Sequence, residues 1–330
     1  MLQKSSPRPL QALLPVLPPA VRLLLAALPE EILDQVEEIR LRQERPLALT
    51  LAAGDVFLDG NGKPVSEPGR AYRVSADDMG RLVQLISASS IYAFEEELRN
   101  GFITLPGGYR AGVCGKAVLE GGRVKTLKYL SSCNIRIFRE IPGAADRILP
   151  FLIDRARRTV CHTVLVSPPR CGKTTMLRDL VRQVSNGVPA LGLAGVNVGL
   201  VDERSEIAGC YLGVPQRDVG VRTDVLDGCP KAEGLLVLLR SMGPQVVATD
   251  EIGRKEDIAA IEEVLNAGVK VLATVHGASL EELSLRPALA YLIKSRTVER
   301  FVILGRSQGV GTVEAIIDGK TLQPLEVKGC

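Results

Sequence analysis

The chain has 330 residues, of which 46% are hydrophobic and 24% charged, so it is long enough for two domains with cores of their own. A net charge of +3 and only 4% aromatic residues argue against a dedicated nucleic-acid or membrane-surface binder, which would be strongly basic or rich in stacking side chains. The seven cysteines are scattered and form no C-x-x-C pair, which argues against a disulfide framework or a zinc site and fits a reducing cytoplasm.

The first 30 residues are rich in Pro and Leu. Lys4 and Arg8 precede an apolar stretch at residues 10–28, as in a signal peptide, but several prolines and Arg22 interrupt it. The chain holds no uninterrupted apolar run of the ~20 residues that a membrane-spanning helix needs. We therefore expect an amphipathic helix over residues 20–28 and a cytoplasmic protein that reaches a membrane through partners.

Short strands and helices alternate up to about residue 141. Ser75 and Asp78 form an S-x-x-[DE] capping box, which predicts that a helix begins there. Gly-rich turns and alternating polarity predict hairpins. The expected strands are residues 38–42, 46–51, 55–58, 102–105, 109–118 and 134–139, and the expected helices are residues 20–28, 75–86 and 91–99. We predict that residues 1–141 form an α+β domain without a catalytic signature.

A linker at residues 141–143 precedes a different pattern. Strands then alternate with helices, which is typical of a parallel sheet with crossover helices. The predicted strands are residues 162–166, 198–202, 246–250, 270–275 and 301–305. The predicted helices are residues 144–158, 173–184, 232–241, 255–266 and 279–294, and a hairpin from residue 311 to residue 319 follows. Residues 142–330 are thus predicted to be an α/β domain.

The chain is organised around a predicted phosphate-binding loop between a strand and a helix. Its residues are Ser167, Pro168, Pro169, Arg170, Cys171, Gly172, Lys173, Thr174 and Thr175. In such a loop, backbone N–H groups and the helix N-terminus face the phosphates, the lysine reaches the β- and γ-phosphates, and the hydroxyl after it holds Mg²⁺. Ser167 stands where the usual pattern has glycine. Either the turn there has an ordinary conformation, or the loop does not bind phosphate.

Three further strand ends carry polar side chains. Asp250 and Glu251 follow an apolar strand, as in a Walker B motif, where Asp250 would hold Mg²⁺ and Glu251 would orient the attacking water. Glu203 and Glu206 follow a second strand and offer additional carboxylates. His276 ends a third strand, where it could sense the γ-phosphate. The alternatives are solvated carboxylates and a structural histidine, and we expect a structural role for His162.

These motifs resemble those of the ATPases of type II and type IV secretion systems, which carry a Walker A motif, an acidic box, a Walker B motif and a His box in this order. Over nearly the whole chain the sequence resembles the stage III sporulation protein AA family. The matching stretches are residues 38–42, 101–115, 135–137, 201–223 and 224–233.

The resemblance implies a RecA-like P-loop NTPase core with a mainly parallel sheet, preceded by a smaller α+β domain that packs over the nucleotide. It also implies a homo-hexamer, ATP and Mg²⁺ as ligands, and partners among the stage III sporulation membrane proteins between mother cell and forespore. In the secretion ATPases the N-terminal domain supplies arginines to the γ-phosphate. Arg110, Arg136 and Arg139 are the candidates here, and Arg222 and Arg240 in the core are the alternatives.

We therefore expect an ATPase that converts ATP to ADP and phosphate and powers a secretion-type channel during sporulation. Two alternatives stay open. One is a nucleic-acid-dependent translocase, which the balanced charge and the scarce aromatic residues disfavour. The other is an ATP-binding scaffold with little turnover, which the serine at position 167, in place of glycine, would favour.

Overall fold

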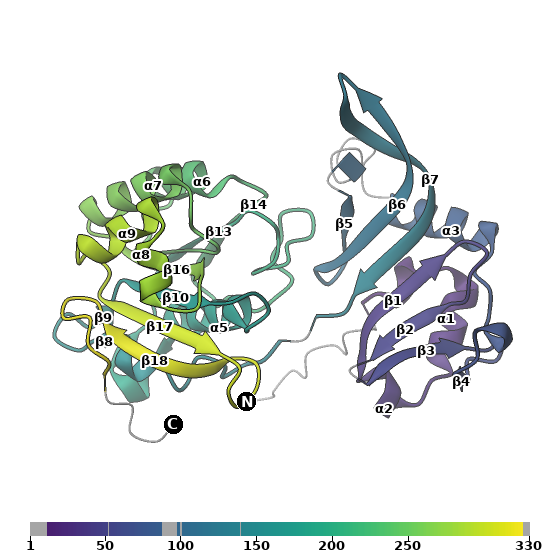
Figure 1. Cartoon of the computed structure of the whole chain (residues 1–330), viewed down its shortest axis with the longest axis horizontal. Coiled ribbons are helices and arrows are strands. Elements are labelled where there is room, and N and C mark those ends of the chain that lie inside the picture. The colour runs from purple at the N-terminus through teal and green to yellow at the C-terminus, as the bar shows by residue number, and fades with distance from the viewer. Residues whose placement is uncertain (1–11, 52, 88–97, 100, 139, 326–330) are drawn as a thin grey trace. The chain divides into compact units, whose positions relative to one another are not determined.

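The computed structural model describes residues 12–51, 53–87, 98–99, 101–138 and 140–325 (Figure 1). The chain divides into two compact units, residues 1–139 and residues 140–330. Each unit has its own sheet and its own apolar core.

Unit 1 contains an antiparallel seven-stranded sheet in the order β4-β3-β2-β1-β7-β6-β5. Its strands are β1 (Val36–Arg42), β2 (Ala48–Leu51), β3 (Gly54–Leu58), β4 (Pro64–Val65), β5 (Phe102–Leu105), β6 (Tyr109–Glu120) and β7 (Arg123–Arg136). Its helices are η1 (Leu14–Val16), α1 (Pro19–Ala26), α2 (Glu30–Leu33), η2 (Pro68–Arg70) and α3 (Ala76–Ile86).

One face of this sheet is apolar and is covered by α1 and α3. Ile39 on β1 and Ile135 on β7 face each other across the ladder and are both fully buried. The helix α3 begins as the capping box predicts, because the Ser75 hydroxyl accepts the backbone N–H of Asp78 at 3.1 Å and the Asp78 carboxylate accepts the N–H of Ser75 at 2.8 Å.

Unit 2 is built on a second seven-stranded sheet in the order β14-β13-β15-β16-β10-β17-β18, which is parallel except for its last pair. The strands are β10 (Thr163–Ser167), β13 (Val198–Asp202), β14 (Thr223–Asp227), β15 (Val246–Thr249), β16 (Lys270–His276), β17 (Arg300–Gly305) and β18 (Thr312–Asp318). The helices are α5 (Lys173–Asn186), α6 (Lys231–Ser241), α7 (Lys255–Asn266), α8 (Leu280–Ser284) and α9 (Pro287–Lys294). The minor elements are η3 (Leu149–Phe151), β8 (Ile153–Asp154), β9 (Thr159–Val160), β11 (Gly187–Val188), η4 (Pro189–Leu191) and β12 (Leu193–Ala194).

Helices cover both faces of the parallel sheet, as expected when its strands are apolar on both sides. Along β10, Leu165 packs on the side of α5, whereas Val164 and Val166 pack on the side of α6, α7 and α9. This layering is the mainly parallel α/β core that the sequence predicts, preceded by a smaller α+β unit.

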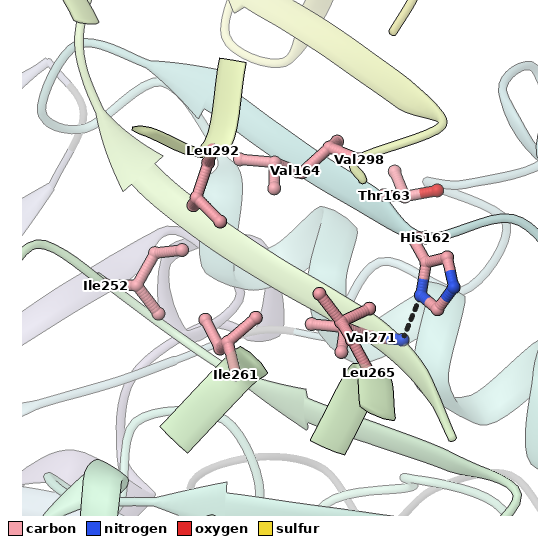
Figure 2. A pocket seen from close by; sticks show the side chains of 9 residues that line it. All are labelled: His162, Thr163, Val164, Ile252, Ile261, Leu265, Val271, Leu292 and Val298. Carbon is pink, nitrogen blue, oxygen red and sulfur yellow. Dashed lines mark hydrogen bonds between the residues drawn. The ribbon is translucent and has the colours of Figure 1, made fainter. Parts of the chain in front are cut away.

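A cavity of about 10 Å³ lies in the second of these layers, among β10, β16, α7 and α9 (Figure 2). Apolar side chains such as Ile261 and Leu292 form most of its wall. His162 lies at one end, where its Nδ1 accepts the backbone N–H of Val271 at 3.3 Å (Figure 2). His162 therefore has the structural role expected of it.

Some predicted elements are wrong or incomplete. Residues 144–158 form turns, η3 and β8 instead of a helix, because the Asp154 carboxylate accepts the backbone N–H groups of Ala156 and Arg157 in a competing turn. Pro287 divides the predicted helix at residues 279–294 into α8 and α9. Proline has no backbone N–H to donate to the preceding turn, so a helix does not continue through it. The strand β14 was not predicted, and most of the predicted helix at residues 91–99 lies outside the described residues.

Across the described residues, no helix combines the length and the apolar character needed to cross a membrane.

Candidate active site

The loop between β10 and α5 has the turn expected of a phosphate-binding loop. Ser167 is the last residue of β10 and is fully buried, so the position that usually holds glycine has an extended backbone here. Within the loop, the backbone is left-handed at Arg170, with a φ of 59°, and at Gly172, with a φ of 81°. The turn at Ser167 therefore has an ordinary conformation and needs no glycine.

Neighbouring segments hold this loop in place. The Ser167 hydroxyl donates to the carbonyl oxygen of Pro168 at 2.9 Å, and Arg306 Nη2, from the β17–β18 connection, donates to the carbonyl oxygen of Arg170 at 2.6 Å. A Cβ atom at Gly172 would come within 3.3 Å of the Cα of Gly311. Glycine suits this position mainly because of its backbone angle, and the close approach adds a smaller constraint.

Lys173 begins α5 and is 6% exposed. Its Nζ lies 3.0 Å from Nδ1 of His276 and 3.5 Å from the carbonyl oxygen of Pro168. On the other side of the imidazole, Nε2 lies 2.8 Å from Oε1 of Glu251. The side chains of Lys173, His276 and Glu251 thus link the ends of β10, β16 and β15.

The proton positions in this chain follow from its chemistry. A lysine ammonium group can only donate, so Nδ1 of His276 accepts, and Nε2 carries the hydrogen that Glu251 accepts. Burial lowers the pKa of Lys173, while the negative charge of Glu251 opposes that shift. The imidazole of His276 thus links the cation of the loop to the carboxylate.

Glu251 has a strained backbone, with a φ of 45°. Its N–H donates to the Thr274 hydroxyl at 2.8 Å, and the next N–H, of Ile252, donates to the carbonyl oxygen of Thr274 at 2.9 Å. Its Oε2 lies 3.3 Å from Nη1 of Arg204. These contacts fix the carboxylate at the edge of the sheet where substrates bind in open α/β folds.

Asp250, immediately before it, is 3% exposed. Burial raises the pKa of its carboxyl to about 7, and the negative charge of Asp202 adds to this effect. A buried carboxylate with acidic neighbours is a favourable place for a divalent cation.

The acidic loop after β13, residues 203–208, is held from two sides. The buried Asp202 carboxylate accepts the backbone N–H groups of Glu206, Ile207 and Ala208 at 2.8–3.0 Å. The buried guanidinium group of Arg178, on α5, donates to the carbonyl oxygens of Glu206 and Ile207 at 2.7 and 2.5 Å. Arg178 therefore ties the helix that follows the phosphate loop to the loop that carries Glu206.

Glu203 points elsewhere, because it forms an ion pair with Lys231 at the start of α6. The structure brings together Lys173, Glu251 and His276, and it leaves Glu203 in a separate pair.

The predicted arginines divide between the two units. Arg110 on β6 lies with its Cζ 3.7 Å from the ring centre of Phe102, and Arg136 on β7 lies 3.5 Å from the carboxylate of Glu38. Arg139 lies outside the described residues. In the core, Arg222 donates to the carbonyl oxygen of Ser185, and Arg240 donates to the carbonyl oxygen of Leu236 within its own helix.

Sequence reasoning missed Arg178, Arg204 and Arg306. Arg204 stands beside the acidic residues and could have been proposed from that position. Nothing in the sequence distinguishes Arg178 or Arg306 from surface arginines, because their roles depend on contacts between segments distant along the chain.

Comparisons with known proteins identify the fold and the family. The fold resembles the crystal structure of the ATPase DotB of Legionella pneumophila, with a TM-score of 0.52 and 16% identity over 86% of this chain and 74% of that one. It also resembles the crystal structure of the pilus retraction motor PilT with bound ADP, with a TM-score of 0.52 and 14% identity over 83% and 75% of the two chains. These likenesses show that the chain shares the RecA-like α/β fold of these two proteins.

Stage III sporulation protein AA of Bacillus subtilis is 42% identical over 303 residues, which are 92% of this chain and 93% of that protein. Residues 10–323 match the family described as sporulation stage III, protein AA. The chain belongs to this sporulation family.

Proposed function

We propose that this protein hydrolyses ATP to ADP and phosphate and thereby powers a secretion-type complex during sporulation. The observation that carries the proposal is the contact of Lys173 with His276 and of His276 with Glu251 beside the phosphate loop. A cation for the phosphates and a carboxylate for the attacking water are the parts that phosphoryl transfer requires.

The loop would bind the phosphates of ATP through its backbone N–H groups and through the positive end of the α5 dipole. Lys173 would compensate the charge of the β- and γ-phosphates. Glu251 would orient the attacking water in line with the γ-phosphate, and His276 holds Glu251 in position through the 2.8 Å contact.

The side chains at this edge fit Mg²⁺ as well as ATP. Asp250 is a buried carboxylate with a raised pKa, and Thr174 supplies a hydroxyl in the first turn of α5. The described residues contain no group of three or more His, Cys, Asp or Glu side chains that could hold a metal alone. This is the usual situation for Mg²⁺, which takes one or two protein oxygens and keeps phosphate and water ligands, and which would neutralise phosphate charge here.

The remaining parts of the proposal rest on family membership and on the likeness to the ATPase DotB and the retraction motor PilT. We propose that residues 1–141 form the domain that supplies arginines to the γ-phosphate, with Arg110 and Arg136 as the described candidates. The chain would act as a homo-hexamer at the cytoplasmic face of stage III sporulation membrane proteins.

The test is phosphate release by the purified full chain with ATP and Mg²⁺. Glu251→Gln should abolish hydrolysis and retain ATP binding, whereas Lys173→Ala should weaken binding as well. Glu263→Gln and Lys320→Ala are matched controls at exposed positions away from the loop and should have no effect.

Hydrolysis that survives both site variants would overturn the proposal. ATP binding without turnover, even with the membrane partner added, would favour a scaffold. Strong stimulation by duplex DNA that disappears as salt rises would favour a translocase.

A further inference from the structure

Arg204 is a second cation at the edge of the sheet that carries the phosphate loop. Its side chain is 61% exposed, and its Nη1 lies 3.3 Å from Oε2 of Glu251. Among the residues that the structure describes, this guanidinium group forms no other hydrogen bond or ion pair. The neighbouring carboxylate of Glu203 does not compete for it, because Glu203 is paired with Lys231. Arg204 therefore meets, through an exposed contact, the carboxylate that would orient the attacking water.

The backbone around Arg204 is held without help from its side chain. The next residue, Ser205, donates its hydroxyl hydrogen to Oδ1 of Asp227 at 2.5 Å. The buried carboxylate of Asp202 accepts the N–H groups of residues 206–208. The guanidinium group can therefore change its partner while the loop after β13 keeps its conformation.

Both carboxylate oxygens of Glu251 face a donor in this structure. Oε1 lies 2.8 Å from Nε2 of His276, and Oε2 lies 3.3 Å from Nη1 of Arg204. A water molecule that attacks a phosphate must donate a hydrogen to one of these oxygens. The His276 contact is the shorter one and continues to Lys173, so the contact that can break at the lower cost is the one to Arg204. Its departure would leave Oε2 to the water.

The relative strength of two contacts decides where the guanidinium group goes when ATP is present. An exposed ion pair changes an equilibrium constant by less than about fivefold. A hydrogen bond between a guanidinium group and a phosphate is charge-assisted at both partners and changes it by roughly tenfold to hundredfold. The attacking water lies between Glu251 and the γ-phosphate, so the phosphate oxygens lie about one water molecule away from the carboxylate that Arg204 contacts. The γ-phosphate therefore competes successfully with Glu251 for Arg204.

We propose that Arg204 exchanges Glu251 for the γ-phosphate when ATP binds. The inference rests on the proposed function and adds a residue to it. In the new position the guanidinium group compensates negative charge on the γ-phosphate, and Oε2 of Glu251 accepts a hydrogen from the attacking water. ADP has no γ-phosphate, so with ADP Arg204 stays with Glu251. Arg204 thus lets the site distinguish ATP from ADP.

The first experiment measures this distinction by titration calorimetry of the purified full chain with Mg²⁺. The ligands are ADP and adenylyl imidodiphosphate, an ATP analogue that keeps the γ-phosphate and resists hydrolysis. Arg204→Ala should weaken binding of the analogue by at least about tenfold and change binding of ADP by less than about twofold, because only the analogue offers a γ-phosphate.

The second experiment measures steady-state ATP hydrolysis. Arg204→Ala should lower kcat by about tenfold to hundredfold, and Arg204→Lys, which keeps the charge but not the planar fork of donors, should recover part of the loss. Arg157→Ala is the matched control, because Arg157 is also an exposed arginine, 70% exposed, paired with a carboxylate, that of Asp154, at 3.1 Å. It should bind and hydrolyse like the parent chain. Thermal melting should be unchanged in all three variants, since each arginine is exposed.

Three results would overturn the inference. Equal weakening of the analogue and of ADP, or no weakening of either, would show that Arg204 does not meet the γ-phosphate. A lower kcat with an unchanged preference for the analogue over ADP would make Arg204 only a support for Glu251. A higher kcat in Arg204→Ala would make it only a block on Glu251. If the parent chain binds neither ligand and releases no phosphate, the proposed function fails and the inference fails with it, so the two failures are distinguishable.

Discussion

His276 makes two different contacts through its two ring nitrogens, and two substitutions can separate them. Oδ1 of Asn can take the place of Nδ1 and accept from Lys173, whereas the amide of Gln reaches the place of Nε2 and can donate to Glu251. His276→Asn should therefore keep the lysine contact at 3.0 Å and lose the glutamate contact at 2.8 Å, and His276→Gln should do the reverse.

The size of each effect follows from the charges involved. A hydrogen bond to a charged group contributes about 1.5–3 kcal/mol, which corresponds to roughly a tenfold to hundredfold change in a rate or binding constant. We expect His276→Asn to lower kcat by that factor with KM nearly unchanged, because Glu251 then loses its position. We expect His276→Gln to raise KM for ATP with a smaller effect on kcat, because Lys173 then loses its position.

Steady-state ATP hydrolysis by the two variants and by His276→Ala is the assay. His276→Ala should combine both defects. If His276→Asn and His276→Gln change kcat and KM in the same way, the imidazole does not act through two separate contacts, and the reasoning is wrong.

Three further predictions concern the framework of the site. Arg178→Met should lower the free energy of unfolding by about 3 kcal/mol, because it leaves the buried carbonyl group of Ile207 unpaired and removes one of the two arginine donors to the carbonyl group of Glu206; a denaturant midpoint equal to that of the parent would contradict this. Burial lowers the pKa of His162 from 6.5 to about 4, so the unfolded chain binds the proton more readily and stability falls as pH drops from 6.5 toward 4. His162→Asn, which keeps an acceptor for the N–H of Val271, should show a smaller decrease in melting temperature over that range than the parent, and an unchanged pH dependence would refute this. Ser167→Gly restores the usual glycine but should not strengthen ATP binding, because the backbone at this position is extended. It should lower the free energy of unfolding by about 1 kcal/mol, because the hydroxyl forms a hydrogen bond. Tighter ATP binding in titration calorimetry would count against this.

The elements that sequence could predict are those with strong local signals. The capping box at Ser75 and the strand-turn-helix pattern around Lys173 each fix the backbone through neighbouring residues, and the structure has both as predicted. The spacing of apolar residues predicts α7 at its observed bounds, Lys255–Asn266. The three strand ends that meet at the site could be predicted as well, because parallel strands bring their carboxyl ends to one edge.

Other features depend on contacts between distant segments. The strand β14 is short and only half-buried at the edge of the sheet, so its sequence has no continuous apolar run. The buried guanidinium of Arg178 looks like any polar residue on an amphipathic helix until the loop after β13 covers it. The connection of Lys173 to Glu251 through His276 needs the strand order of the sheet, which no local pattern contains.

The position of β10 in its sheet also has a consequence for synthesis of the chain. Its two neighbours are β16 and β17, and the latter ends at Gly305. The ribosome must add about 130 residues after Lys173 before both neighbours exist, which takes roughly ten seconds at common elongation rates. The antiparallel sheet of unit 1 is complete before β10 is made. During synthesis, unit 1 can therefore fold while the loop between β10 and α5 has no supporting strands, and a nascent chain stalled before residue 300 would have a folded first unit and an incomplete second sheet.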